Sequence, residues 1–175
     1  MSKLPSYPKV TNLKDLLAIA YQIEIDAVDR YTLLADQMET HNNAELTKIF
    51  RDLARAEGIH GEEVRRLADF DVVAHARAMA KVKHGESPEE ADMSSAHYLM
   101  TPWHALQLSL AGEKRALAYF QSIVETAKDE KVKKMAAELV EEEAEHVNLV
   151  HRLLQRYPKP NETWADDLDP PVSQE

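Results

Sequence analysis

The stretches ARAEGIHGEE, residues 54–63, and EEEAEHVNLV, residues 141–150, share one pattern, a glutamate followed three positions later by a histidine. The two pairs are Glu57 with His60 and Glu143 with His146. On a helix, positions i and i+3 lie on one face, so each pair presents a carboxylate and an imidazole to the same point. Apolar residues flank both pairs at spacings of three and four, which predicts two amphipathic helices with polar groups on their apolar faces.

The segments IEIDAVDRY and AGEKRALAYF each place one more glutamate, Glu24 and Glu113, on an otherwise apolar helical face. A shift of 89 positions moves Glu24 onto Glu113, and a shift of 86 moves Glu57 onto Glu143. This internal repeat predicts two helical hairpins related by a pseudo-twofold axis. Because each glutamate lies roughly a dozen residues from the start of its helix, we expect all four at the middle of the bundle.

Prolines and capping residues delimit four long helices. The eight prolines leave residues 9–87 and 103–157 uninterrupted, and a proline inside a helix breaks it. Side chains that cap helix starts then mark the beginnings. The predicted helices run from Thr11 or Asn12 to about Glu39, from the cap Asn43 to about Phe70, from Thr101-Pro102 past Val124, and from a turn at Asp129 to the region before Pro158.

The segment between the second and third predicted helices, residues 71–100, is far longer than the usual link between neighbouring helices. We therefore predict an all-α fold, a four-helix bundle of two antiparallel hairpins joined by a long crossover. Ser87-Pro88-Glu89-Glu90 predicts the capped start of a short helix within that crossover. The expected domains are an extended N-terminal segment at 1–10, the bundle at 11–157, and an extended, acidic, proline-rich tail at 158–175.

Composition excludes several functions. The 175 residues include 31 acidic and 21 basic side chains, a formal charge of −10, and no cysteine. Such a charge repels phosphate backbones and anionic lipid heads, so we expect neither nucleic acid nor a membrane as a partner. Without cysteine there are no disulfides, thiolate metal sites or cysteine nucleophile. The sequence shows no export signal and no apolar run long enough to span a membrane, which predicts a cytoplasmic protein.

Six residues are candidate metal ligands: Glu24, Glu57, His60, Glu113, Glu143 and His146. Burying one unpaired carboxylate is costly, and four together would also repel one another. Two divalent ions would cancel four negative charges, and oxygen and nitrogen ligands suit iron or manganese. We expect two iron ions per chain, or manganese or a mixed pair in their place. The alternative is a metal-free polar core, or surface residues that lean inward.

Together, the four quoted segments resemble the ligand segments of rubrerythrin-like members of the ferritin-like superfamily, and the resemblance extends over about residues 12–157. It implies a ferritin-like bundle with a non-haem di-iron centre that reduces hydrogen peroxide or dioxygen and, in some branches, oxidises ferrous iron. It also implies a role for each ligand. Glu57 and Glu143 would bridge the two ions, with Glu24 and His60 completing one and Glu113 and His146 the other.

Departures from the family refine these expectations. Ala116 stands where rubrerythrin proper has an additional glutamate that exchanges with a histidine when the iron changes oxidation state, so we do not expect that exchange. Gly58 replaces the haem methionine of bacterioferritin, so we expect no haem. Without a cysteine-ligated rubredoxin domain, electrons would come from an external donor such as a rubredoxin-like or flavin protein. We expect a homodimer in preference to a closed storage shell.

Tyr31 follows Glu24 by seven residues, two helical turns along the same face. Its hydroxyl is placed to hold a ligand carboxylate, and the alternative is an ordinary core tyrosine. The function that these observations favour is a di-iron oxidoreductase that scavenges peroxide. Two alternatives remain. A ferroxidase or iron-binding protein needs only the same six residues, and a di-iron hydroxylase needs an apolar substrate pocket.

Overall fold

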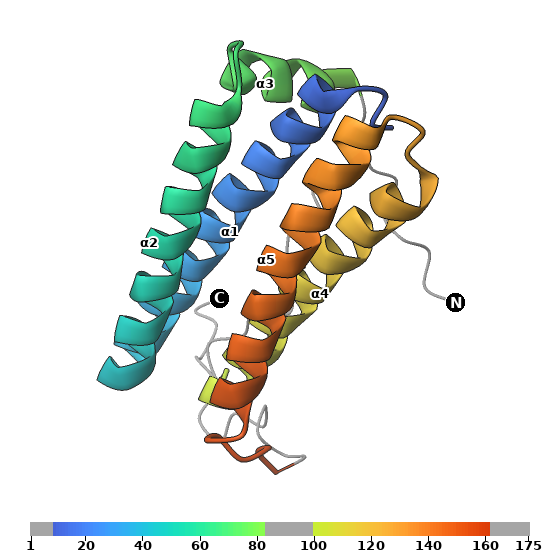
Figure 1. Ribbon diagram of the computed structural model, residues 1–175. Coiled ribbons are helices and arrows are strands. Elements are labelled where there is room, and N and C mark those ends of the chain that lie inside the picture. Colours follow the sequence, from blue (N-terminus) through green and yellow to red (C-terminus); the bar gives the residue numbers. More distant parts are fainter. Residues whose placement is uncertain (1–8, 83–99, 162–175) are drawn as a thin grey trace, which may run out of the picture.

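The described part of the chain is built from helices packed as two hairpins (Figure 1). The computed structural model describes residues 9–82 and 100–161. Its helices are α1 (Leu13–Thr40), α2 (Ala44–Leu67), α3 (Val72–Val82), α4 (Pro102–Thr126) and α5 (Glu130–Leu154). α1 packs antiparallel to α2, and α4 packs antiparallel to α5. The prediction of an all-α, ferritin-like four-helix bundle is confirmed.

The four long helices begin close to the predicted positions, directly after the caps Asn12, Asn43, Thr101 and Asp129. Asn43 and Thr101 were predicted as caps, Asn12 as one of two possible starts, and Asp129 as part of a turn. The side-chain oxygen of Asn12 accepts a hydrogen bond from the backbone N–H of Asp15 at 3.0 Å. The side chain of Asn43 does the same for the N–H of Leu46, also at 3.0 Å. These bonds satisfy donors that the first helical turn leaves without a partner.

A short turn between α1 and α2 sets the height of the first two candidate ligands. Asn42 has φ of 56°, in the left-handed region that asparagine adopts more readily than most residues. The backbone N–H of Asn43 donates to the carbonyl of Met38 at 2.9 Å and closes the end of α1. Because Glu24 and Glu57 lie at similar distances along the chain from this turn, the hairpin brings them level with each other.

α2 ends earlier than predicted, and an unpredicted helix follows it. The backbone of Ala68 is extended and ends α2 at Leu67, so the predicted end at Phe70 is wrong by three residues. Asp71 then starts α3, since its side chain accepts from the N–H of Ala74 at 3.0 Å. The predicted short helix at 87–90 lies outside the described residues.

α3 packs on the first half of α1. Val72 and Ala76 form an apolar cluster with Ala18, and His75 Nε2 lies 3.0 Å from Asp15 Oδ1. α2 ends at this end of the bundle, whereas α4 begins at the opposite end (Figure 1). The end of α2 and the start of α4 therefore lie at opposite ends of the bundle, as expected for a crossover.

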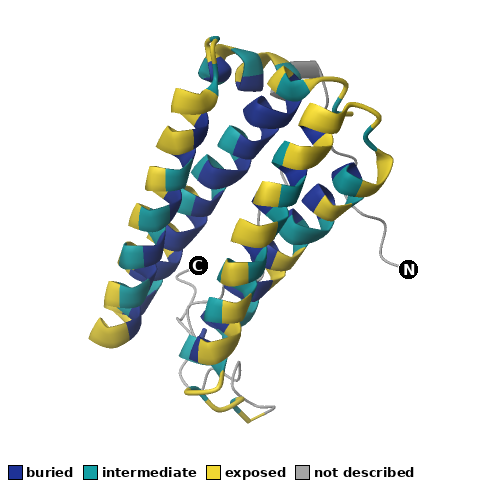
Figure 2. Cartoon of the chain, viewed as in Figure 1, coloured by how far each residue is buried: buried dark blue, intermediate teal, exposed yellow. Residues whose placement is uncertain are grey.

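Besides the small cluster beneath α3, the described residues form two larger apolar clusters, one near each end of the bundle. One cluster joins the end of α1 and the start of α2 to the start of α4 and the end of α5, and includes Leu34, Phe50, Leu106 and Val150. The other joins the opposite ends and includes Leu16, Val64, Phe120 and Ala136. Buried faces turn inward along all four long helices (Figure 2). The four candidate glutamates occupy the level between the two clusters.

The outward faces of the helices are largely exposed (Figure 2). Large apolar side chains on these faces include Leu33, Ile59 and Leu67. Within 9–82 and 100–161, no helix combines the length and apolar character required to cross a membrane.

Candidate metal centre

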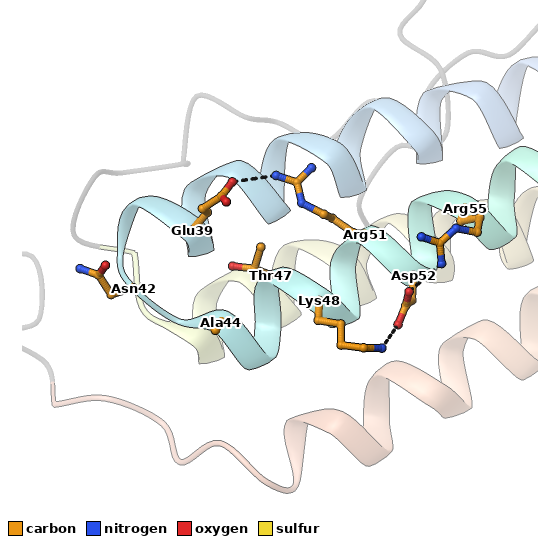
Figure 3. Close-up of a pocket in the computed structure, with 8 residues that line it drawn as sticks. All are labelled: Glu39, Asn42, Ala44, Thr47, Lys48, Arg51, Asp52 and Arg55. Atoms are coloured by element: carbon orange, nitrogen blue, oxygen red, sulfur yellow. Dashed lines mark hydrogen bonds and ion pairs between the residues drawn. The ribbon is translucent and has the colours of Figure 1, made fainter.

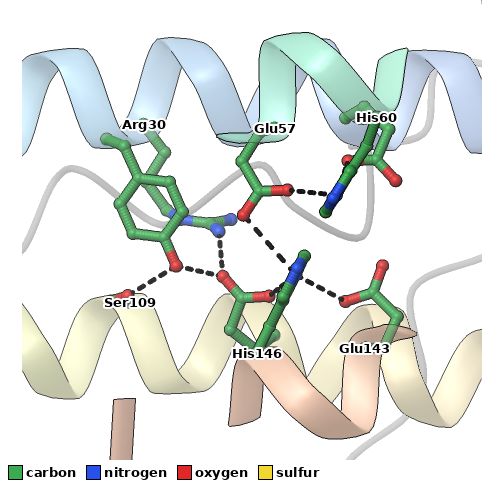
Figure 4. A network of polar contacts seen from close by, with 9 residues as sticks. Arg30, Glu57, His60, Ser109, Glu143 and His146 are labelled. Atoms are coloured by element: carbon green, nitrogen blue, oxygen red, sulfur yellow. Dashed lines mark hydrogen bonds and ion pairs between the residues drawn. The ribbon is translucent and has the colours of Figure 1, made fainter. Parts of the chain in front are cut away.

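Each long helix contributes one buried glutamate to the middle of the bundle. The exposed fractions are 3% for Glu24 on α1, 1% for Glu57 on α2, 2% for Glu113 on α4 and 4% for Glu143 on α5. One turn after the glutamates of α2 and α5, the side chains of His60 and His146 reach the same level, with 28% and 15% exposed. All six residues predicted from the sequence therefore lie together, and Figure 4 labels four of them, Glu57, His60, Glu143 and His146.

Glu57 lies between the two imidazoles. Its Oε2 is 3.6 Å from His60 Nδ1, and its Oε1 is 3.5 Å from His146 Nδ1. Since each carboxylate oxygen faces a different histidine, Glu57 stands where a carboxylate that bridges two ions would stand (Figure 4).

The other three glutamates surround the same two rings. Glu113 Oε2 lies 3.5 Å and Glu143 Oε2 lies 4.0 Å from His146 Nδ1. Glu24 Oε2 is 3.9 Å from His60 Nδ1. Each imidazole is therefore near at least two carboxylates.

The residues present fit divalent ions. In two groups, one atom from each residue lies within 4.8 Å of the others: Glu57, His60 and His146, and Glu113, Glu143 and His146. Glu24 belongs to neither group, although it lies beside His60. Glu57 Oε1 and His60 Nδ1 are buried without a hydrogen-bond partner. Buried polar atoms are rarely left unpaired, and metal coordination would satisfy both.

Burial and mutual repulsion disturb the protonation of the glutamates. The pKa of Glu24 is raised well above its usual value by burial and by the charges of Glu57 and Glu143. Burial and the charge of Glu113 likewise raise the pKa of Glu143. Burial also works against ionisation of Glu113, but His146 and Arg30 overcome it and lower the pKa of Glu113. The centre therefore contains two kinds of carboxyl group: Glu24 and Glu143, in which the protonated form is favoured, and Glu113, in which the ionised form is favoured.

The histidines respond to the same carboxylates. Burial disfavours the charged form of His146, but its hydrogen bond to Glu113 and the nearby glutamates outweigh burial and raise its pKa to about 9. The nearby carboxylate of Glu57 raises the pKa of His60, against the opposing effect of burial. Without metal, bound protons partly compensate the negative charge of the four buried glutamates.

A hydrogen-bonded chain from α1 holds Glu113 in place. The hydroxyl of Tyr31 and the guanidinium of Arg30 both contact Glu113 Oε1, with Arg30 Nη2 at 2.8 Å. The hydroxyl of Ser109 donates to the Tyr31 oxygen at 2.9 Å (Figure 4). The Arg30 guanidinium also lies 4.7 Å from the centroid of the Tyr31 ring, a cation–π distance.

Tyr31 was predicted from the sequence as a residue that holds a ligand carboxylate, whereas Arg30 and Ser109 were not predicted to lie at the centre. Both are buried, at 3% and 0% exposed. The missed signal was helical spacing, because Arg30 follows the buried Ala27 by three positions and precedes the buried Leu34 by four. A charged residue in that position faces the core and requires a buried partner.

A surface pocket lies near the α1–α2 turn (Figure 3). It is lined by Glu39, Asn42, Ala44, Thr47, Lys48, Arg51, Asp52 and Arg55. The charges are paired with one another: Arg51 with Glu39 at 2.7 Å, and Asp52 with both Lys48 at 2.5 Å and Arg55 at 2.8 Å. This polar, open pocket does not supply the apolar chamber that a hydroxylase needs.

The fold and this centre together define a ferritin-like helical bundle with carboxylates and imidazoles between its hairpins. The rubrerythrin family model matches residues 15–96. The crystal structure of an uncharacterized conserved protein from Magnetospirillum magnetotacticum MS-1 is similar, with 34% identity, a TM-score of 0.67, and coverage of 86% of this chain and 98% of that chain. No curated protein matches significantly. The chain belongs to the rubrerythrin-like group of the ferritin-like superfamily.

The family match and the geometry complement each other. The matched residues include Glu24, Glu57 and His60, but they end before α4. The candidates on the second hairpin, Glu113 and His146, are brought to the same centre by the fold. Family and Glu/His groups together indicate a di-iron ferritin-like protein.

Proposed function

We propose that this protein is a non-haem di-iron oxidoreductase that reduces hydrogen peroxide, with dioxygen as the alternative oxidant. The observation that carries the proposal is the burial of four carboxylates around two imidazoles, at exposed fractions of 4% or less for the glutamates. Arg30 contributes one permanent positive charge to this layer, and two divalent ions would contribute four. The layer therefore suits a pair of metal ions better than a metal-free polar core.

The family resemblance implies a role for each ligand, and the positions of the side chains support these roles. Glu57, with one oxygen toward each imidazole, would bridge the two ions. We assign Glu143 as the second bridge, by its equivalence to Glu57 in the repeat. Glu24 and His60 would then bind one ion, and Glu113 and His146 the other. Oxygen and nitrogen donors of this kind favour iron or manganese.

A bound pair of ferrous ions can supply two electrons, and reduction of one hydrogen peroxide to two waters consumes two electrons and two protons. The chain itself contributes burial, since the apolar clusters at both ends shield the glutamates from bulk water. It also holds Glu113 in a fixed orientation through Arg30 and Tyr31. We propose that an external rubredoxin-like or flavin protein returns the electrons.

The test begins with metal analysis of protein purified without chelators. We expect two iron or manganese ions per chain. The Glu57→Ala variant should lose most of this metal. Glu62 is an exposed glutamate on the same helix that pairs with the exposed Arg65, so Glu62→Ala should retain the metal. Equal metal content in the wild type and Glu57→Ala would remove Glu57 from the centre.

Reactivity is tested by mixing the anaerobic ferrous protein with one equivalent of peroxide or of dioxygen and following absorbance by stopped flow. Faster oxidation by peroxide supports the proposal. Preference for dioxygen, together with uptake of iron beyond two ions per chain, would favour a ferroxidase. Inertness to both oxidants would overturn the oxidoreductase assignment.

A further inference from the structure

The pseudo-twofold repeat that relates α1 to α4 is broken around the metal centre. Glu24 and Glu113 are equivalent in the repeat, but the residues beside them are not. Besides His146, Arg30 and Tyr31 contact Glu113, and Ser109 donates a hydrogen bond to the Tyr31 oxygen behind them. At the same offset of 89 positions, the counterparts beside Glu24 are Tyr119, Phe120 and Ala20.

On the Glu113 side, the carboxylate is already engaged. Arg30 and Glu113 form an ion pair with both side chains only 2% exposed. The hydroxyl of Tyr31 contacts the same oxygen, Oε1. Only Oε2 is left facing His146, at 3.5 Å. A metal ion bound on this side would find only Oε2 of Glu113 available, and the positive charge of Arg30 would lie on the other side of that carboxylate.

On the Glu24 side, no lysine or arginine among the described residues forms an ion pair with Glu24 as Arg30 does with Glu113. Ala20 and Phe120 belong to the apolar cluster at that end of the bundle. The charged groups that act on Glu24 are other carboxylates, Glu57 and Glu143 above all. The facing imidazole is His60, with Nδ1 at 3.9 Å from Glu24 Oε2. Negative charge is therefore less compensated here than beside Glu113.

We propose that Arg30 makes the two metal positions unequal, so that the first divalent ion binds on the Glu24–His60 side and the second binds more weakly on the Glu113–His146 side. The proposal rests on the proposed di-metal centre and adds the order in which it fills. A guanidinium remains charged at every pH at which the protein is folded. In a buried site, it repels a nearby cation with little screening.

Arg30 acts in this scheme as a positioning residue. It does not bind metal, but it holds Glu113 Oε1 and lowers the attraction of that carboxylate for a second ion. We expect the second dissociation constant to exceed the first by roughly ten- to a hundredfold. Repulsion between the two ions alone would also weaken the second step, so the side that fills first is the decisive observation.

The direct experiment uses Co²⁺ as the probe. Crystals of the metal-free full chain are grown with one equivalent of Co²⁺, and anomalous scattering locates the ion. Occupancy on the Glu24–His60 side supports the proposal. Occupancy on the Glu113–His146 side, or equal occupancy of both, would overturn it. If no Co²⁺ binds even in excess, the proposed di-metal function fails as well.

Charge at position 30 is tested by two matched variants in solution. Stepwise Co²⁺ titrations are followed by visible absorption, with circular dichroism as a check on folding. In Arg30→Gln, which removes the charge but retains an amide donor, the gap between the two dissociation constants should shrink by about tenfold. Arg30→Lys retains the charge and should keep the gap. An unchanged gap in folded Arg30→Gln would contradict the role of Arg30.

Two ligand variants keep the proposal testable if Arg30→Gln does not fold. Glu113→Ala should retain the tighter Co²⁺ step and lose the weaker one. Glu24→Ala should lose the tighter step. The reverse pattern would show that the Glu113 side fills first. Retention of two metal ions in both variants would instead contradict the proposed ligand set itself, which separates failure of the proposed function from failure of the filling order.

Discussion

The imidazoles of His60 and His146 stack across the two hairpins, with ring centroids 5.2 Å apart and planes within 5° of parallel. Two imidazoles this close repel each other when both carry a proton. Both nevertheless have raised pKa values, because carboxylates surround them. In the metal-free protein, protons bound to the two histidines therefore supply part of the positive charge that metal ions would supply.

The stability of the metal-free protein should fall as pH rises. The pKa of His146 is raised from 6.5 to about 9 in the folded chain, so its contribution is complete below about pH 6.5 and is lost as pH increases through 9. The raised pKa values of Glu24 and Glu143 act in the same direction. We expect a loss on the order of 2–3 kcal/mol between pH 6 and 9, measured by urea unfolding with a chelator present.

Two comparisons make this prediction specific. His146→Gln removes the titrating group, so its unfolding free energy should depend less on pH. Metal-loaded protein should show no such decline, because metal displaces the protons and binds more tightly as they leave. A wild-type curve that is flat from pH 6 to 9 without metal would contradict the raised pKa of His146.

Replacing glutamates by glutamine should separate the two kinds of carboxylate. Glu143 has a raised pKa, so Glu143→Gln resembles its protonated form and should stabilise the metal-free protein at pH 8. Glu113 is ionised and paired with Arg30. Glu113→Gln leaves a buried guanidinium without its counter-ion and should cost about 3–5 kcal/mol.

Urea unfolding of both variants and the wild type, with chelator at pH 8, measures this contrast. Both variants replace a buried carboxyl group by an amide of the same size at the same level of the bundle, so each serves as the control for the other. Equal shifts of the same sign would show that Arg30 does not distinguish Glu113 from Glu143.

The α1–α2 turn offers a prediction about the scaffold. Asn42 adopts φ of 56°, which glycine tolerates without cost and alanine does not. Asn42→Ala should lower the free energy of unfolding by about 1 kcal/mol, and Asn42→Gly should be neutral or slightly stabilising. Thermal unfolding of the two variants tests this, and equal melting temperatures would indicate that the turn changes its conformation.

The sequence was sufficient to predict which side chains would lie together, because the signal was local and repeated. Glu57 and His60 share a helical face by spacing alone, and Glu143 with His146 repeats that spacing. The turn at Asn42 then fixes the height of Glu24 against Glu57. No long-range packing was needed to place these residues on the inward faces.

What the sequence did not reveal depends on contacts between distant segments. The partner of Arg30 is Glu113 on another hairpin, so the spacing along α1 places Arg30 on the inward face but does not identify its partner. α3 is short, and its packing on Ala18 of α1 became evident only from the fold. The early end of α2 also depends on α3. The backbone is extended at Ala68, and Asp71 caps α3 three residues later.

The last prediction concerns what happens to the ligands when the metal is oxidised. Ala116 is fully buried in the apolar cluster next to the centre, where it supplies no carboxylate to replace a histidine. Glu113 is held at Oε1 by Arg30 and Tyr31, which opposes its movement. We expect the six ligands to be the same in the ferrous and ferric states. X-ray absorption of iron-loaded protein, before and after one equivalent of peroxide, should show an unchanged number of imidazoles per iron. Because the chain has no cysteine, and we expect it to bind no haem, it should react once and then stop until an external donor is added. Loss of an imidazole signal on oxidation would contradict the fixed ligand set, and repeated turnover without a donor would contradict the need for a partner.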